Sequence, residues 1–99
     1  MNILKYTDFL PDRPSVFQIK ITDRIQQIAI ALGKGAVLEK HKTSIPATLI
    51  VLKGSIRFVL PDRELTLNSL DFFEIPLEEV HHVEGLDAEN LFLITKEVI

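Results

Sequence analysis

The feature that most constrains this chain is a succession of short β-prone segments, each closed by a turn signal. About eight or nine segments of roughly four to eight residues follow one another after residue 15, with turn residues at intervals of ~8–12 residues. Residues 16–22, for example, alternate apolar and polar side chains with the period of two that is typical of a half-buried strand. No helical period of about ten residues separates the segments, which excludes a parallel α/β fold. The pattern predicts an all-β sandwich or barrel.

The expected strands can be placed by residue number. They cover residues 16–22, 25–32, 48–53, 56–60, 64–67, 72–75, 81–84 and 90–95. Turn signals at residues 23–24 and 54–55 predict two hairpins, and the polar stretch of residues 39–46 predicts a loop. Two prolines bracket a turn near the end of residues 1–14, which we expect to form a leading segment before the barrel begins at about residue 15.

Length and composition predict that these strands form one small globular domain. The chain has 99 residues, 46% of them hydrophobic, which predicts a single core and a single domain over residues 1–99. Its net charge is −3 and its basic residues are dispersed, so a nucleic acid is not expected as a partner. The chain has no cysteine, which excludes disulfides and thiolate chemistry. It has neither a signal-peptide pattern nor a run of about 18 apolar residues, so we expect a cytoplasmic protein without a membrane partner.

Three histidines are the side chains best suited to chemistry near neutral pH: His41, His81 and His82. Neighbouring side chains in a strand point to opposite faces, so His81 and His82 cannot both face the interior. Val83 shares the face of His81, and we therefore expect His81 to be the inward residue of the two. We also expect His41, far away in the sequence, to meet His81 across the barrel.

The spacing of glycine, proline and histidine between residues 35 and 85 resembles the two-part signature of the cupin family of small β-barrels. The first part is Gly, five residues, His-x-His, three or four residues, Glu, six residues and Gly, and it is matched by Gly35, His41 and Gly54. The second part is Gly, five residues, Pro-x-Gly, two residues, His, three residues and Asn, and it is matched in register by Pro76 and His81. The resemblance implies a small single-domain, cupin-like jelly-roll β-barrel.

The chain departs from this signature at several positions. Thr43 stands in place of the second histidine, Ala47 in place of the glutamate, Leu70 and Glu78 in place of glycines, and Gly85 in place of the asparagine. Typical members of the family hold a metal ion with four residues, and of that set the resemblance leaves His41 and His81. Glu39 lies two residues before His41, so in a regular strand it would share the same face and give a set of two histidines and one carboxylate.

Three functions are consistent with the sequence. The first is a barrel that binds a small, partly apolar molecule in its interior, oriented by His41, Thr43 and His81, with little or no metal-dependent catalysis. The second is a metal-dependent enzyme of the oxygenase or isomerase type, as the resemblance implies. In it, His41 and His81 would bind Zn²⁺, Fe²⁺, Mn²⁺ or Ni²⁺, and Glu39 or substrate oxygens would complete the shell. The third is a sensory or assembly module. The resemblance also implies a homodimer, for which the apolar strand at residues 16–21 is available.

Overall fold

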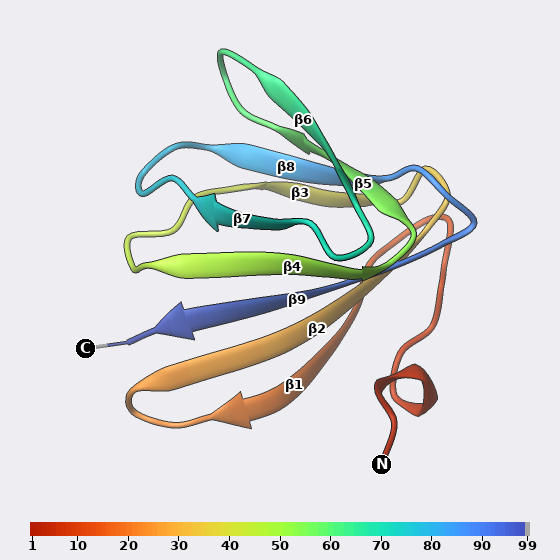
Figure 1. The fold of residues 1–99 in the computed structure, drawn as a ribbon, viewed down its shortest axis with the longest axis horizontal. Coiled ribbons are helices and arrows are strands. Elements are labelled where there is room, and N and C mark those ends of the chain that lie inside the picture. The colour runs from red at the N-terminus through yellow and green to blue at the C-terminus, as the bar shows by residue number, and fades with distance from the viewer. Residues whose placement is uncertain (99) are drawn as a thin grey trace.

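Nine strands follow one another along the chain after a short 3₁₀ turn (Figure 1). The computed structural model describes residues 1–98. The 3₁₀ turn η1 spans Ile3–Lys5, and the strands are β1 (Ser15–Ile21), β2 (Ile25–Gly33), β3 (Val37–His41), β4 (Ala47–Lys53), β5 (Ser55–Val59), β6 (Glu64–Asn68), β7 (Phe72–Ile75), β8 (His81–Gly85) and β9 (Glu89–Glu97). Within residues 1–98, no helix is long and apolar enough to cross a membrane.

The strands form two antiparallel sheets that face each other (Figure 1). One sheet has five strands in the order β1-β2-β9-β4-β7, and the other has four in the order β3-β8-β5-β6. After β2 the chain changes sheet at every connection except the one between β5 and β6. This arrangement confirms the predicted all-β jelly-roll barrel.

One of the two predicted hairpins is confirmed and the other is wrong. Strands β1 and β2 pair antiparallel across the turn at residues 22–24. Strands β4 and β5 do not pair, because β4 lies between β7 and β9 in one sheet while β5 lies between β6 and β8 in the other. Gly54, with a φ of 74°, carries the chain from one sheet to the other. A glycine that turns the chain locally has the same sequence signal whether the next strand pairs or crosses.

The polar stretch predicted to be a loop contains a strand. Strand β3 ends at His41 and pairs with β8, but its register shifts between Leu38 and His41. Its last three residues are exposed. The alternation of apolar and polar residues that normally marks a strand is therefore missing from this segment.

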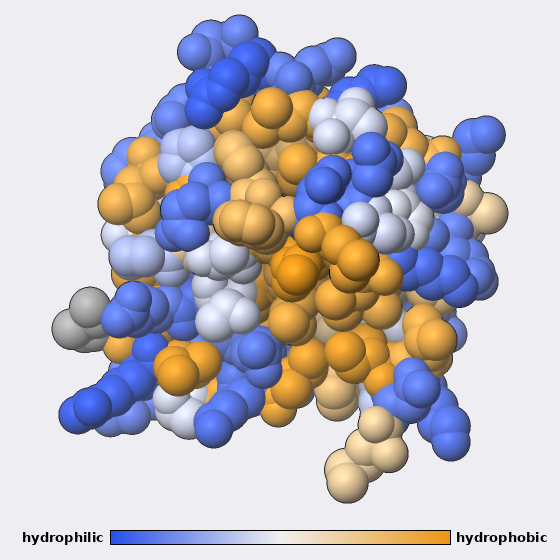
Figure 2. Space-filling model, viewed as in Figure 1, coloured by the Kyte–Doolittle hydropathy of each residue, from blue (hydrophilic) through white to orange (hydrophobic). Residues whose placement is uncertain are grey.

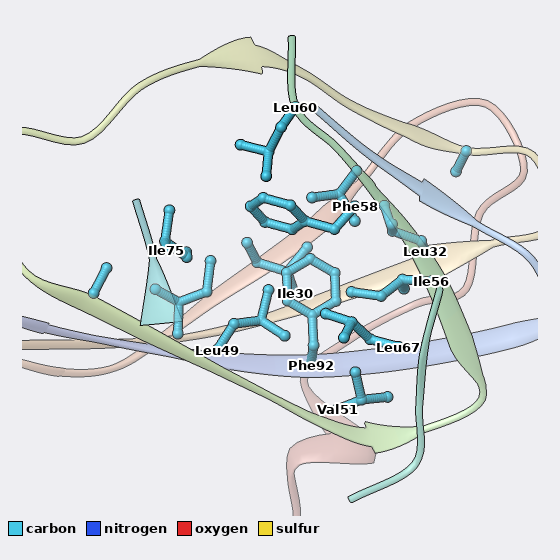
Figure 3. Packing of buried hydrophobic residues seen from close by; sticks show 14 residues of the cluster. Ile30, Leu32, Leu49, Val51, Ile56, Phe58, Leu60, Leu67, Ile75 and Phe92 are labelled. Carbon is cyan, nitrogen blue, oxygen red and sulfur yellow. The ribbon is translucent and has the colours of Figure 1, made fainter. Parts of the chain in front are cut away.

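Apolar side chains fill the space between the two sheets (Figure 3). The largest fully buried ones are Phe58 from one sheet and Phe92 from the other, and both are 0% exposed. A second cluster lies on the outer face of the five-stranded sheet, where the leading segment brings Ile3 and Phe9 against Ala29 and Leu91. The protein's own apolar side chains thus fill the middle of the barrel. Polar groups lie at the two ends of the barrel.

At one end of the barrel a single buried amide joins both sheets. The Asn90 side chain is 0% exposed. Its Oδ1 accepts hydrogen bonds from the backbone N–H groups of Ser55 and Asp87, each at 3.0 Å. Its Nδ2 donates to the carbonyls of Leu32 (3.0 Å) and Asp87 (2.8 Å). We call this side chain and its four bonds the Asn90 network; sequence analysis did not identify it.

The four positions at which the cupin signature has glycine all have a left-handed backbone. Gly35 and Gly54 keep the glycine, with φ values of 83° and 74°. Leu70 and Glu78 replace it, yet their φ values are 73° and 63°, and no other non-glycine among residues 1–98 has a positive φ. A Cβ makes this conformation unfavourable by roughly 1–2 kcal/mol. The signature spacing therefore reflects the turns of the fold, and two of those turns are strained in this chain.

Returning glycine to the two strained turns should stabilise the protein. Leu70→Gly and Glu78→Gly are each expected to raise the free energy of unfolding by about 0.5–1 kcal/mol, because relief of strain exceeds the added entropy of glycine in the unfolded chain. The Leu70 side chain is 76% exposed, so its removal costs little packing. Urea denaturation measures the change, with Leu77→Gly as the adjacent control that should destabilise. If Leu70→Gly were also destabilising, the strain argument would be wrong.

Candidate functional site

The structure brings His41 and His81 together at one end of the barrel. This end, which we call the open end, is where β3 and β9 finish and β8 begins, on the left in Figure 1. The two residues are register partners on neighbouring strands, not partners across the barrel as the sequence suggested. Their Nε2 atoms are 3.2 Å apart and their ring centroids 4.3 Å apart. The His81 ring also stacks on the Phe58 ring at 4.8 Å, so the pair lies directly on the apolar core.

Backbone carbonyls fix the tautomer of both rings. His41 Nδ1 lies 2.7 Å from the carbonyl oxygen of Glu39, and His81 Nδ1 lies 3.1 Å from that of Glu79. A carbonyl oxygen can only accept, so each Nδ1 carries the hydrogen and donates it. In the neutral rings both Nε2 atoms are therefore unprotonated, and their lone pairs face each other. Two facing lone pairs repel each other. A proton, a metal ion or a hydrogen-bond donor of a ligand, placed between or beside the two nitrogens, would relieve that repulsion.

The two rings differ in burial. His81 is 2% exposed, whereas His41 is exposed to solvent. Burial lowers the pKa of His81 below its usual value, and electrostatic repulsion from His41, Lys96 and His82 lowers it further, while the hydrogen bond to the Glu79 carbonyl acts in the opposite direction. His81 is thus held as a neutral acceptor, with His41 between it and water. His82 is only half-buried, on the opposite face, as strand alternation predicts.

The lowered pKa of His81 predicts a loss of stability on acidification. The unfolded chain takes up this proton at the ordinary pKa of 6.5, while the folded chain takes it up only at a lower pH. The free energy of unfolding should therefore be highest above pH 6.5 and fall as the pH drops toward the folded-state pKa, by at most about 1.4 kcal/mol per pH unit. Urea denaturation between about pH 8 and 5.5 measures the slope. It should diminish in His81→Phe and persist in His82→Gln; an equal slope in all three proteins would assign the effect to other groups.

Thr43, predicted to orient a ligand, is buried and bonded within its own loop. Its hydroxyl donates to the carbonyl of Ile45 at 2.8 Å and accepts from the N–H of Ile45 at 3.3 Å. The Thr43 carbonyl also accepts from the N–H of Glu78 at 2.9 Å. Thr43 therefore holds the β3–β4 loop against the β7–β8 loop, and both loops flank the histidine pair.

The acidic side chains do not join the histidines. Glu39 is exposed, and it supplies its backbone carbonyl to His41. The register shift in β3 removes the regular alternation on which the predicted carboxylate ligand depended. In the described part of the chain, no group of three or more His, Cys, Asp or Glu residues is placed to hold a metal ion. The protein therefore presents two ring nitrogens at this site.

Lys96 is a residue of the open end that sequence analysis missed. In β9, Phe92 and Ile94 belong to the inner core cluster, so by alternation Lys96 also starts on the inner face. It is partly buried and pairs in register with Gln26 of β2 and Ala47 of β4. The signal was available in the sequence, because continuing the alternation of β9 by two residues past Ile94 places the lysine inside.

Two hollows adjoin these residues. One of about 280 Å³ is lined by Lys40, Val59, Leu60, Pro61, Val80, His81 and His82. Another, of about 860 Å³, is lined by Asp23, Arg24, Ile25, Thr95, Lys96, Glu97 and Val98. The smaller is lined by His81 and the larger by Lys96, so there is space for a small group beside each of these two residues.

Comparison with solved structures identifies similar folds. The chain is similar to a cupin superfamily protein from Desulfitobacterium hafniense, with 14% identity and a TM-score of 0.83 over 93% of this chain and 84% of that one. It is also similar to an RmlC-like cupin with a double-stranded β-helix fold from Methanocaldococcus jannaschii (20% identity, TM-score 0.80, 86% and 80% coverage) and to KdgF from a Halomonas species (18%, 0.78, 94% and 86%). No protein-family model and no curated protein matches the sequence. At these identities the likeness concerns the fold.

Proposed function

We propose that this chain, which has the cupin fold, binds a small molecule at the open end of its barrel through His41 and His81. The observation that carries the proposal is the pair of Nε2 atoms 3.2 Å apart, whose Nδ1–H groups are both engaged by backbone carbonyls. A hydroxyl, amine or acid group placed beside the two nitrogens gives them the donor that they lack. The Phe58 ring stacks beneath His81 and holds that ring in place.

The place of the proposed ligand differs from the sequence expectation. A ligand deep inside the barrel would compete with the packed core around Phe58 and Phe92, both 0% exposed (Figure 3). His41 is exposed at the open end, and the two flanking loops meet there through the hydrogen bond from Glu78 to Thr43. We therefore assign the ligand to the open end, with Thr43 shaping the loop and not contacting the ligand through its hydroxyl.

A thermal-shift screen tests this proposal. The probes are small alcohols, amines and organic acids, each added at millimolar concentration to the whole chain. A probe that binds the folded state raises the melting temperature by mass action. We expect at least one probe to do so, the effect to vanish in His41→Ala, and it to persist in the matched control His82→Ala. If no probe raises the melting temperature, or if His41→Ala responds as the wild type does, the proposal is wrong.

A second candidate function is the binding of a divalent metal ion by the same two nitrogens. The favouring observation is the pair of Nδ1–H bonds to backbone carbonyls, because metal-ligating histidines commonly donate their other ring nitrogen in this way. Two nitrogens 3.2 Å apart also suit one ion at about 2.0–2.1 Å from each. When bound, such an ion would polarise an oxygen group of a substrate.

Metal titration separates the two candidates. If the second holds, Zn²⁺, Mn²⁺, Ni²⁺ or Fe²⁺ raises the melting temperature of the wild type and leaves that of His41→Ala unchanged. A wild-type melting curve that does not move with any of the four ions removes this candidate. That result leaves the small-molecule proposal standing, because its probes are added without metal.

We further propose that the chain forms a homodimer through the edge of β1. Strand β1 is an edge of the five-stranded sheet, with one side unpaired within the chain. Val16 and Ile21 on it are 54% and 48% exposed, and Figure 2 shows apolar side chains gathered where this sheet meets the leading segment. An exposed apolar edge strand is a template for pairing, and antiparallel pairing of β1 with its own copy satisfies a two-fold axis.

Light scattering tests the dimer. Val16→Lys combined with Ile21→Lys should give a folded monomer, because both side chains are exposed and the added charges would repel across the two-fold axis. The control is Phe72→Lys, on the opposite edge strand β7, where the side chain is 75% exposed. We expect this variant to stay dimeric. A wild type that is monomeric at working concentration, or a dimer lost only in the Phe72 variant, would contradict the assignment to β1.

A further inference from the structure

The charge of Lys96 lies at the open end and is not used by the protein's own ion pairs. No ion pair within residues 1–98 includes this lysine. Its side chain starts on the inner face beside Ala47, whose methyl group is 1% exposed. The signature has a glutamate at the position of Ala47. Because alanine is uncharged, Lys96 has no carboxylate at this neighbouring position.

Two acidic residues near this end, Glu78 and Glu79, have basic partners. Glu78 lies 3.5 Å from the Lys42 ammonium, and Glu79 lies 3.7 Å from the Arg63 guanidinium. The ammonium of Lys96 is among the groups that lower the pKa of the buried His81 ring, so its charge acts at this end of the barrel.

There is room for a ligand around the lysine. Lys96 and Arg24 both line the 860 Å³ hollow, which also includes the acidic residues Asp23 and Glu97. The size is within the range of ordinary small-molecule sites. The hollow therefore offers room for a charged group beside Lys96.

We propose that Lys96 binds an anionic oxygen group, a carboxylate, of the small molecule held at the open end. This inference rests on the proposed function and names its ligand class: an organic acid that also carries a hydrogen-bond donor for the histidine pair, such as a hydroxy acid. A lysine ammonium supplies three donors and a full charge to a carboxylate, and a partly buried position strengthens that bond. Lys96 acts here as a specificity residue, because a neutral analogue of the same shape loses this contact.

Matched acid and amide probes test the inference on the whole chain. The probes are acetate, lactate and benzoate, each compared with its amide, and binding is followed through backbone amide chemical shifts at residues 41–45, 47, 77–81 and 96. We expect at least one acid to bind the wild type about tenfold more tightly than its amide. Lys96→Gln should remove this preference by weakening the acid and leaving the amide unchanged. Lys20→Gln, an exposed lysine of β1, is the control and should keep the preference.

The outcomes distinguish this inference from the function on which it rests. If acids and amides bind at these residues with equal affinity, and Lys96→Gln changes neither, the lysine subsite is wrong and the open-end site stands. If Lys20→Gln weakens the acid as much as Lys96→Gln does, the preference comes from overall charge and the subsite is also wrong. If none of the six probes shifts these resonances, neither the subsite nor the open-end site survives.

Discussion

Replacing Asn90 by alanine should be among the most destabilising single changes in this protein, with a loss of about 3–5 kcal/mol in the free energy of unfolding. The side chain is 0% exposed and makes four hydrogen bonds to backbone groups of Leu32, Ser55 and Asp87. Alanine leaves those buried groups without a partner, and each such group costs roughly 1–3 kcal/mol unless water replaces the bond. For a domain of this size we expect the melting temperature to fall by roughly 15–30 °C.

The control for Asn90→Ala is Asn68→Ala. Asn68 is exposed at the end of β6, so this variant should lose less than about 0.5 kcal/mol in the free energy of unfolding. Both variants are measured by urea denaturation at the same pH. A loss below about 1 kcal/mol in Asn90→Ala would mean that water satisfies the same backbone groups, and the Asn90 network would then not be what joins the sheets at this end.

The second large effect is expected for Phe58→Ala, which should lower the free energy of unfolding by about 3–5 kcal/mol. Phe58 is 0% exposed and contacts the rings of Phe73 at 5.0 Å and His81 at 4.8 Å. Its removal leaves a cavity under the histidine pair, because the two sheets cannot close over it. The change should therefore weaken both the fold and the binding of any probe at the open end.

The exposed Phe72 provides the matched control. Phe72→Ala removes the same atoms from a side chain that is 75% exposed, so its loss should stay below about 1 kcal/mol. Equal losses in the two variants would contradict the assignment of Phe58 to the centre of the core. Phe58→Leu should recover part of the stability, because it refills most of the space.

Much of this fold could be predicted from local patterns. Alternation along β2, β8 and β9 is strong because each strand has one face on the core, and it correctly placed Val83 and His81 inward. The signature spacing also predicted the jelly roll, because its glycine positions mark left-handed turns that the chain keeps even at Leu70 and Glu78. These features depend on a few neighbouring residues, so a sequence records them directly.

The features that were missed depend on distant pairing. A turn at Gly54 does not reveal whether the next strand pairs or crosses to the other sheet. The register shift in β3 removes the period-two signal near His41. The Asn90 network joins segments far apart in the sequence, so no local pattern points to it. Alternation along β9 indicates that Lys96 points inward, but its effect on His81 depends on how the two sheets face each other.

One arrangement of atoms defines the candidate site. Two imidazole rings at the open end each donate Nδ1–H to a backbone carbonyl and turn an unprotonated Nε2 toward the other ring. His81 is kept neutral by burial, and His41 is accessible to a ligand. Both proposals about ligands, and the metal candidate, require these two nitrogens to be free acceptors.

An NMR spectrum of the histidine ring nitrogens above pH 7, recorded before and after the acid and alcohol probes are added, shows which of these nitrogens carry hydrogen. We expect His41 and His81 both to be protonated on Nδ1 and unprotonated on Nε2, and we expect a binding probe to shift the Nε2 signals of both while His82 stays unchanged. An Nε2–H tautomer for either residue in the free protein, or probe-induced shifts confined to His82, would contradict this expectation.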